Sequence, residues 1–160
     1  MNPQTRKVTV KHGRTAKRFL VEDLDAWRPV AEHLASMIRP GAVVTLQGPL
    51  GAGKTTLVQY LARELGALKR ATSPTFALIR VYQARSPEPG ARHAGLRASG
   101  LELRRLVHVD AYRIEDERDL VALDLDEELL ETGTAVLVEW PEKIPNWLAG
   151  KRPIEVRIDI

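Results

Sequence analysis

The sequence predicts an α/β fold with a mostly parallel central sheet, because strand-like apolar runs alternate with helix-like segments along the chain. A length of 160 residues favours a single domain. Hydrophobic residues make up 44% of the chain and charged residues 28%, which are proportions typical of a folded globular protein. The absence of cysteine excludes disulfide frameworks, thiol nucleophiles and zinc sites that need sulfur.

Apolar periodicity and the positions of Gly and Pro predict the individual elements. Apolar residues at helical spacing predict helices at residues 27–38 and 57–65, and the acidic residues 115–131 are also expected to be helical. Pro29 fits the first helix only in or just before its first turn, and Gly66 is expected to follow the end of the second. Apolar and β-branched runs predict strands, at residues 42–46, 76–82, 106–109, 135–138 and 154–158. The second and third of these runs are expected to pair as an antiparallel hairpin.

Charge is distributed unevenly along the chain. Residues 1–18 contain six Lys or Arg and no acid, so we interpret them as a basic N-terminal extension to a single domain at residues 19–160. Residues 110–131 contain ten acids and two Arg. Residues 84–105 contain five Arg together with Pro, Gly and Ser, which is typical of a long mobile loop inserted into the domain. The net charge of +3 is too small by itself to indicate a nucleic-acid-binding protein.

No segment has the features of a membrane or export signal. No run approaches the roughly 18 to 20 apolar residues of a membrane helix. The basic N-terminus also lacks the apolar stretch of a secretory signal. We therefore expect a cytoplasmic protein that does not associate with membranes.

The strongest functional signal lies between the first predicted strand and the second predicted helix. There the chain reads Gly48-Pro49-Leu50-Gly51-Ala52-Gly53-Lys54-Thr55, a full match to the P-loop pattern G-x-x-x-x-G-K-[ST]. Glycines let backbone N–H groups converge on phosphate oxygens, and the start of a helix adds its positive dipole end. Lys54 can reach the terminal phosphates and the Thr55 hydroxyl can ligate Mg²⁺. The motif predicts a nucleotide-binding site.

A P-loop needs a further carboxylate, which usually stands at the end of a neighbouring strand. Asp110 and Glu139 both follow apolar runs and so qualify. At least one of them is expected to serve the metal, and sequence spacing does not rank them. The four histidines show no metal-ligand spacing, and we interpret His108 as a strand residue rather than a base. A guanine-specifying N-K-x-D pattern is absent, which disfavours a GTPase.

Four motifs in a fixed order together resemble one family. They are Gly48 to Thr56, then Thr72-Ser73-Pro74-Thr75-Phe76, then His108-Val109-Asp110-Ala111-Tyr112-Arg113, then Val138-Glu139-Trp140-Pro141-Glu142. The series resembles the TsaE (YjeE) family, bacterial P-loop ATPases required to form threonylcarbamoyladenosine at position 37 of certain tRNAs. The P-loop alone is generic, whereas the other three motifs are specific. The likeness covers roughly residues 30–158, apart from residues 84–105.

The resemblance implies a P-loop NTPase-like, three-layer fold and a set of roles. Thr55 and Glu139 would hold Mg²⁺, and Asp110 would be a second carboxylate of the catalytic site. Lys54, Asp110 and Glu139 would be the catalytic residues, and Thr75 would lie on a segment that responds to the nucleotide. The residues implied to bind ATP are Gly48, Gly51, Ala52, Gly53, Lys54, Thr55 and Thr56. The implied partners are the threonylcarbamoyl-transferring subunit and its inactive paralogue, which form a heterodimer, with tRNA contacted indirectly or weakly.

Two other function classes stay open. A small-molecule P-loop kinase could use the Arg-rich residues 84–105 as a lid, although the sequence shows no signature of an acceptor pocket. A nucleotide-gated scaffold would bind ATP and leave it intact, against which Glu139 argues. We expect a Mg²⁺-dependent ATPase that is slow alone, because no arginine lies within the P-loop or next to Glu139.

Overall fold

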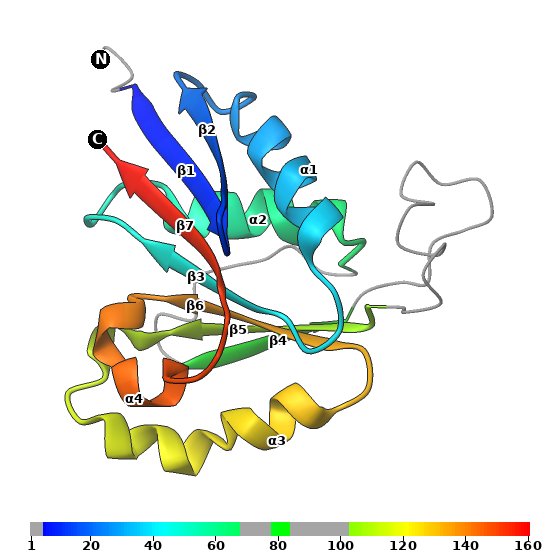
Figure 1. Ribbon diagram of the computed structural model, residues 1–160, viewed down its shortest axis with the longest axis vertical. Coiled ribbons are helices and arrows are strands. Elements are labelled where there is room, and N and C mark those ends of the chain that lie inside the picture. Colours follow the sequence, from blue (N-terminus) through cyan, green and yellow to red (C-terminus); the bar gives the residue numbers. More distant parts are fainter. Residues whose placement is uncertain (1–4, 68–77, 84–102) are drawn as a thin grey trace.

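The protein folds as an α/β sandwich around a single seven-stranded sheet, as a computed structural model shows (Figure 1). The structure describes residues 5–67, 78–83 and 103–160. Helices cover both faces of the sheet, with α1 and α2 on one side and α3 and α4 on the other (Figure 1). The predicted α/β fold with three layers is confirmed.

The sheet has the strand order β2-β1-β7-β3-β6-β5-β4. Its four central strands, β7, β3, β6 and β5, run parallel, whereas β1, β2 and β4 pair antiparallel at the two edges. The strands are β1 (Arg6–His12), β2 (Thr15–Val21), β3 (Val43–Gln47), β4 (Ile79–Gln83), β5 (Arg105–Asp110), β6 (Thr134–Glu139) and β7 (Ile154–Asp159). Strands β4 and β5 form the antiparallel pair that the sequence predicts.

The helices are mostly short and follow the strands closely. The α-helices are α1 (Trp27–Met37), α2 (Lys54–Glu64), α3 (Leu125–Leu130) and α4 (Pro145–Leu148), and the 3₁₀ turns are η2 (Ala111–Arg113), η3 (Glu117–Leu123) and η4 (Pro141–Lys143). Pro29 lies in the first turn of α1, and Gly66 follows the end of α2 with a φ of 77°, both as predicted. None of the described helices is both long and apolar enough to cross a membrane.

An apolar core lies on each face of the sheet, between the strands and the helices that cover them. Alternate strand residues such as Val8, Leu46 and Leu137 pack under α1 and α2, which contribute Leu34 and Leu57. The residues between them on β5 and β6 face the opposite side, where they pack with side chains of η2, η3, α3 and α4. Because both faces of β5 and β6 are covered, these strands read as near-continuous apolar runs.

The boundary expected between residues 18 and 19 is wrong. It falls inside β2, and β1 extends the main sheet by pairing with β7 along residues 7–11. Alternation explains the error. Val8 and Val10 are buried while Lys7 and Lys11 are exposed, so a half-buried strand pair has the composition of a basic tail. Charged side chains on such an edge also discourage pairing with other chains.

The acidic region 115–131 is not one helix. Asp124, with a left-handed backbone (φ 49°), separates the 3₁₀ turns of η3 from the short helix α3. The Thr72–Phe76 motif, Thr75 included, lies outside the described residues, as does most of the expected loop at 84–105. The described end of that loop is ordered: Leu103 is buried, and Arg105 opens β5 with a 2.7 Å ion pair to Glu128.

Candidate functional site

The P-loop connects β3, a central strand, to α2 and ends at the helix N-terminus. Gly53 caps α2 without a side-chain hydrogen bond, and the first turn of α2 contains no acid. The first N–H groups of a helix have no partner within it, so this helix start presents donors and a positive dipole end to an anion. The predicted order of strand, loop and helix is present.

Two glycines of the loop are required by close packing. A Cβ on Gly48 would lie 2.6 Å from the carbonyl oxygen of Ile158 in β7. A Cβ on Gly53 would lie 2.5 Å from Cζ2 of Trp27, the first residue of α1, which is only 2% exposed. Gly53 also has a φ of 102°, which side-chain-bearing residues rarely adopt. The loop is therefore held against β7 and α1 by contacts outside the motif.

The ammonium of Lys54 is folded back onto the loop. Its Nζ donates to the carbonyl oxygens of Gly48 (2.7 Å) and Pro49 (2.9 Å) and lies 3.9 Å from the ring centre of Trp140. Burial lowers the pKa of Lys54, while the carboxylates of Glu139, Glu142 and Asp110 oppose that shift. A phosphate would offer this cation stronger acceptors than two neutral carbonyls do.

Glu139 ends β6 directly beside the start of α2. Its side chain is buried, and its Oε1 accepts a hydrogen bond of 3.3 Å from the Thr55 hydroxyl. Parallel pairing of β5 with β6 puts Asp110 opposite Glu139, at the carboxyl ends of the two strands. The structure thus brings together the three oxygen-bearing residues singled out from the sequence, and it puts Glu139 rather than Asp110 in contact with Thr55.

Asp110 lies at the junction of β5 and η2. Its Oδ1 accepts the backbone N–H of Tyr112 at 3.1 Å, which caps the 3₁₀ turn. Burial raises the pKa of Asp110 and Glu139 raises it further, against the opposing effects of the Tyr112 hydrogen bond, His108 and Lys54. A carboxyl whose pKa is raised in a pocket is suited to accept or hand on a proton.

One cavity of about 430 Å³ joins these groups. Among its lining residues are Gly51, Ala52, Gly53, Lys54, Thr55, Thr56, Asp110, Arg113, Glu139 and Trp140. Trp140 has a left-handed backbone (φ 59°), and its ring stacks obliquely on Tyr112 with a centroid distance of 5.0 Å. Such a conformation costs a bulky residue about 1–3 kcal/mol. It turns the indole over Lys54, so Trp140 forms a wall of the cavity as well as packing.

Oxygen donors in this cavity fit a magnesium ion. Mg²⁺ is usually held by one or two carboxylates together with substrate phosphates and water. Thr55 and Glu139, 3.3 Å apart, could supply a hydroxyl and a carboxylate beside the phosphate-binding helix start. No group of three or more His, Cys, Asp or Glu suited to a metal occurs within residues 5–67, 78–83 and 103–160. A hydroxyl and a carboxylate in this position fit a metal that is shared with the phosphates of a nucleotide.

Sequence reasoning missed two residues of the site. Arg113 lines the cavity from η2, although the sequence shows no arginine in the P-loop or next to Glu139. His108 is a strand residue, as interpreted, but its Nε2 also lies 3.0 Å from Oε1 of Glu139. Both residues belong to the motif that contains Asp110, and their closeness to Asp110 in the sequence is the signal that could have indicated a place in the site.

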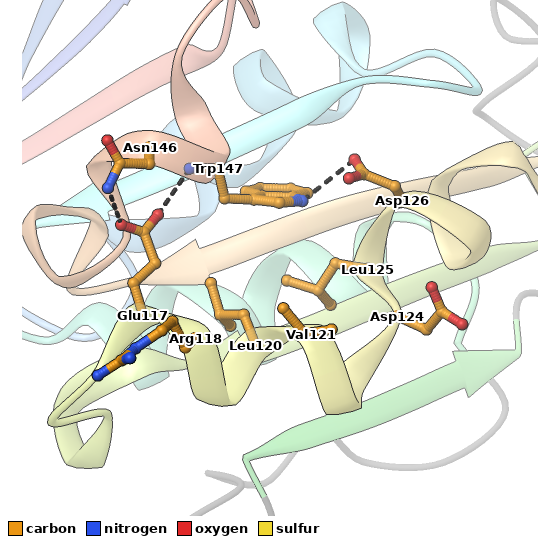
Figure 2. A pocket seen from close by; sticks show the side chains of 9 residues that line it. All are labelled: Glu117, Arg118, Leu120, Val121, Asp124, Leu125, Asp126, Asn146 and Trp147. Atoms are coloured by element: carbon orange, nitrogen blue, oxygen red, sulfur yellow. Dashed lines mark hydrogen bonds between the residues drawn. The ribbon is translucent and has the colours of Figure 1, made fainter.

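A second cavity of about 390 Å³ lies between η3, α3 and α4, away from the P-loop (Figure 2). Figure 2 shows Trp147 across it, with the indole Nε1 donating to Asp126 (3.1 Å). Glu117 accepts from the backbone N–H of Trp147 (2.6 Å) and from Asn146 (2.7 Å). These bonds join α4 to the acidic segment, so Trp147 is a structural residue.

Comparison with known proteins gives concordant matches. A family model described as threonylcarbamoyl adenosine biosynthesis protein TsaE matches residues 21–160. The tRNA threonylcarbamoyladenosine biosynthesis protein TsaE of Streptomyces coelicolor is 38% identical over 133 residues, which are 82% of this chain and 78% of that protein. The protein of the same name from Mycobacterium tuberculosis is 35% identical over 153 residues, 92% of this chain and 79% of that protein. The crystal structure of YdiB from Bacillus subtilis superposes with a TM-score of 0.58 at 27% identity, covering 87% of this chain and 73% of that one.

Proposed function

Since the chain belongs to the TsaE family of tRNA threonylcarbamoyladenosine biosynthesis proteins, we propose that it is the ATP-binding and ATP-hydrolysing component of that modification system. The observation that carries the proposal is the convergence of the P-loop, Thr55 and Glu139 on one cavity. A P-loop followed by a helix start binds phosphate, and a buried carboxylate beside its Thr is the usual companion of a metal-bound triphosphate.

In this proposal the P-loop residues bind the triphosphate of ATP. Backbone N–H groups of Gly51, Gly53 and Thr56 face the phosphates, and Lys54 exchanges its two carbonyl acceptors for phosphate oxygens. Thr55 and Glu139 hold Mg²⁺, which when bound neutralises charge on the terminal phosphates.

Asp110 and Arg113 complete the site from the other strand. Asp110 lies opposite Glu139 with a raised pKa, so it is suited to take a proton from an attacking water. Arg113 is an exposed residue of the cavity lining, where it could pair with phosphate. The indole ring of Trp140 covers the Lys54 ammonium and limits its access to solvent.

We further propose that the partners are the threonylcarbamoyl-transferring subunit and its inactive paralogue, with tRNA contacted indirectly, in the cytoplasm. The isolated chain would hydrolyse ATP slowly, because no arginine lies within the P-loop or next to Glu139, and Arg113, in the cavity lining, is exposed to solvent. Groups supplied by a partner raise phosphoryl-transfer rates by roughly 10³- to 10⁵-fold in other P-loop systems.

The test is ATP turnover by the chain alone, with the heterodimer, and with tRNA added. We expect slow turnover that needs Mg²⁺ and rises with the heterodimer, and loss of turnover in Glu139→Ala with nucleotide binding retained in EDTA. Brisk turnover that the heterodimer leaves unchanged would refute partner stimulation. Normal hydrolysis by Glu139→Ala but not by Asp110→Ala would move the metal to β5.

The kinase alternative has a separate readout. A kinase would consume ATP in proportion to an added acceptor, whereas an ATPase releases inorganic phosphate without one. The arginines that would form its lid lie mostly outside the described residues. Arg105, at the described end, is a strand residue paired with Glu128 and lies apart from the cavity lining.

A further inference from the structure

His108 is a buried polar residue that the proposed mechanism does not use. It lies in β5 two residues before Asp110, and its side chain has no exposed surface. Parallel pairing sets His108 opposite Leu137, one position along the same sheet face from the pair formed by Asp110 and Glu139. This diagonal relation brings the imidazole Nε2 to 3.0 Å from Oε1 of Glu139.

The two ring nitrogens of His108 differ in their surroundings. Nε2 faces the Glu139 carboxylate, so it carries the hydrogen and donates it. Nδ1 is buried and has no hydrogen-bond partner among the described residues. An unpaired buried nitrogen disfavours histidine at a position where its neighbours Val107 and Val109 are apolar. Within the described part of the chain, the hydrogen bond from Nε2 to Glu139 is the one contact of His108 that an apolar residue at this position could not make.

Glu139 is held by two groups from different elements, both at Oε1. The Thr55 hydroxyl approaches from the start of α2 at 3.3 Å, and His108 approaches from β5 at the shorter distance of 3.0 Å. Thr55 must also face any metal bound beside the P-loop, whereas His108 is fully buried on β5 and is not among the residues that line the cavity. The histidine can therefore hold Glu139 whether or not a ligand is present. The ring of Tyr82 in turn stacks beside the imidazole, with a centroid distance of 6.2 Å.

We propose that His108 is a positioning residue, whose Nε2–H fixes the Glu139 carboxylate in the orientation that receives Mg²⁺ with the bound nucleotide. The inference rests on the proposed function, because it assumes that Glu139 serves the metal. Residues that orient a metal-binding side chain typically change metal affinity or activity by 10- to 100-fold when they are removed. His108→Leu should lose this effect, and His108→Gln, whose amide nitrogen reaches the position of Nε2, should retain most of it.

The experiment measures the dissociation constant of a non-hydrolysable ATP analogue by calorimetry, in Mg²⁺ and in EDTA. The ratio of the two constants is the metal-dependent gain in affinity. We expect H108L to reduce this gain by about tenfold with the EDTA constant unchanged, and H108Q to stay within about threefold of the parent. In a Glu139→Gln background, which itself loses the gain, H108L should add no further loss.

Leu106→Ala is the matched control for a purely structural effect. Leu106 is buried on the same face of β5, two residues before His108, and it packs in the core away from Glu139. It should lower the melting temperature without changing the metal-dependent gain. If H108L fails to fold, His108→Asn, whose amide is too short to reach Glu139, replaces it and should also lose the gain.

The outcomes separate the two proposals. A parent protein that binds the analogue equally in Mg²⁺ and EDTA would refute the metal assignment in the proposed function, and with it this inference. A parent with a clear gain that H108L or H108N leaves intact would refute the role of His108 alone. Equal losses in H108L and H108Q, or a loss in Leu106→Ala as large as in H108L, would also overturn it.

Discussion

Replacing Gly53 by alanine should destabilise the protein, because the new side chain would collide with Trp27, which is distant from the P-loop in sequence but packs against it. The added Cβ would meet Trp27 Cζ2 at 2.5 Å and Cη2 at 3.1 Å. Trp27 is buried at the start of α1 and has little room to move. Overpacking of this kind costs about 1–3 kcal/mol, and the left-handed backbone at φ 102° adds about 1–2 kcal/mol for any residue with a Cβ. The expected loss in the free energy of unfolding is therefore about 2–5 kcal/mol.

Urea unfolding of a double-mutant cycle separates the two contributions. Trp27→Phe removes the ring atoms that collide with the new Cβ, at a cost of roughly 1–3 kcal/mol for the space that it leaves. Gly53→Ala combined with Trp27→Phe should be more stable than the sum of the single effects by about 1–3 kcal/mol. The backbone part, about 1–2 kcal/mol, should remain in the double variant.

Two results would refute this reasoning. An additive double mutant would show that Trp27 does not restrict Gly53, and the cost would then belong to the backbone alone. A Gly53→Ala variant within about 0.5 kcal/mol of the parent would contradict both contributions. Nucleotide affinity should fall in Gly53→Ala and recover only in part in the double variant, because the loop N–H groups depend on the same backbone.

Three further predictions concern separate parts of the molecule. Lys54→Ala should weaken ATP binding at least about a hundredfold, or 2.7 kcal/mol, with an unchanged circular dichroism spectrum, because Lys54 donates to two neutral loop carbonyls and, among the described residues, forms no ion pair that the fold depends on. Equal affinities in variant and parent would contradict the phosphate site. Burial raises the pKa of Asp110, so the folded state is destabilised at pH values above that pKa, where the carboxyl is ionised. Asp110→Asn should therefore raise the melting temperature by roughly 1–3 °C at pH 7. It should not do so at pH 3, where the carboxyl of the parent protein is also neutral. Trp147→Phe should lose its bond to Asp126 and about 0.5–1.5 kcal/mol in urea unfolding while ATP affinity stays unchanged, and a fall in affinity would link the second cavity to the site.

The elements that sequence predicts well are those whose signals are local. The strands at β3 and β6 are buried on both faces, so their apolar runs are unbroken and their limits agree with prediction within about one residue. Trp27, Val30 and Leu34 mark α1 through a one-sided period, and Gly66 ends α2 because its left-handed backbone favours glycine.

The edge strands and the acidic segment show where local signals fail. Strand β2 buries only Val21 fully, so the composition of its other residues is that of a solvated tail. Only the antiparallel pairing with β1 identifies it as a strand. The segment 115–131 is rich in Glu and Leu, which favour helices, yet Asp116 and Asp124 redirect the backbone at two turns. Pairing across a sheet and a change of backbone direction at one residue leave little trace in composition.

Contacts between elements decide what the site residues can do, and these contacts depend on register. Asp110 and Glu139 each end an apolar run, which is why both could be proposed and neither preferred. The parallel register of β5 and β6 then puts them opposite each other, and the approach of α2 brings Thr55 to Glu139. A shift of β5 by one residue would turn His108 to the opposite face of the sheet and leave Glu139 with Thr55 alone. The contact between His108 and Glu139 therefore depends on one strand register. Because His108 acts only through that contact, H108L should not reduce the metal-dependent gain in affinity any further in the Glu139→Gln background.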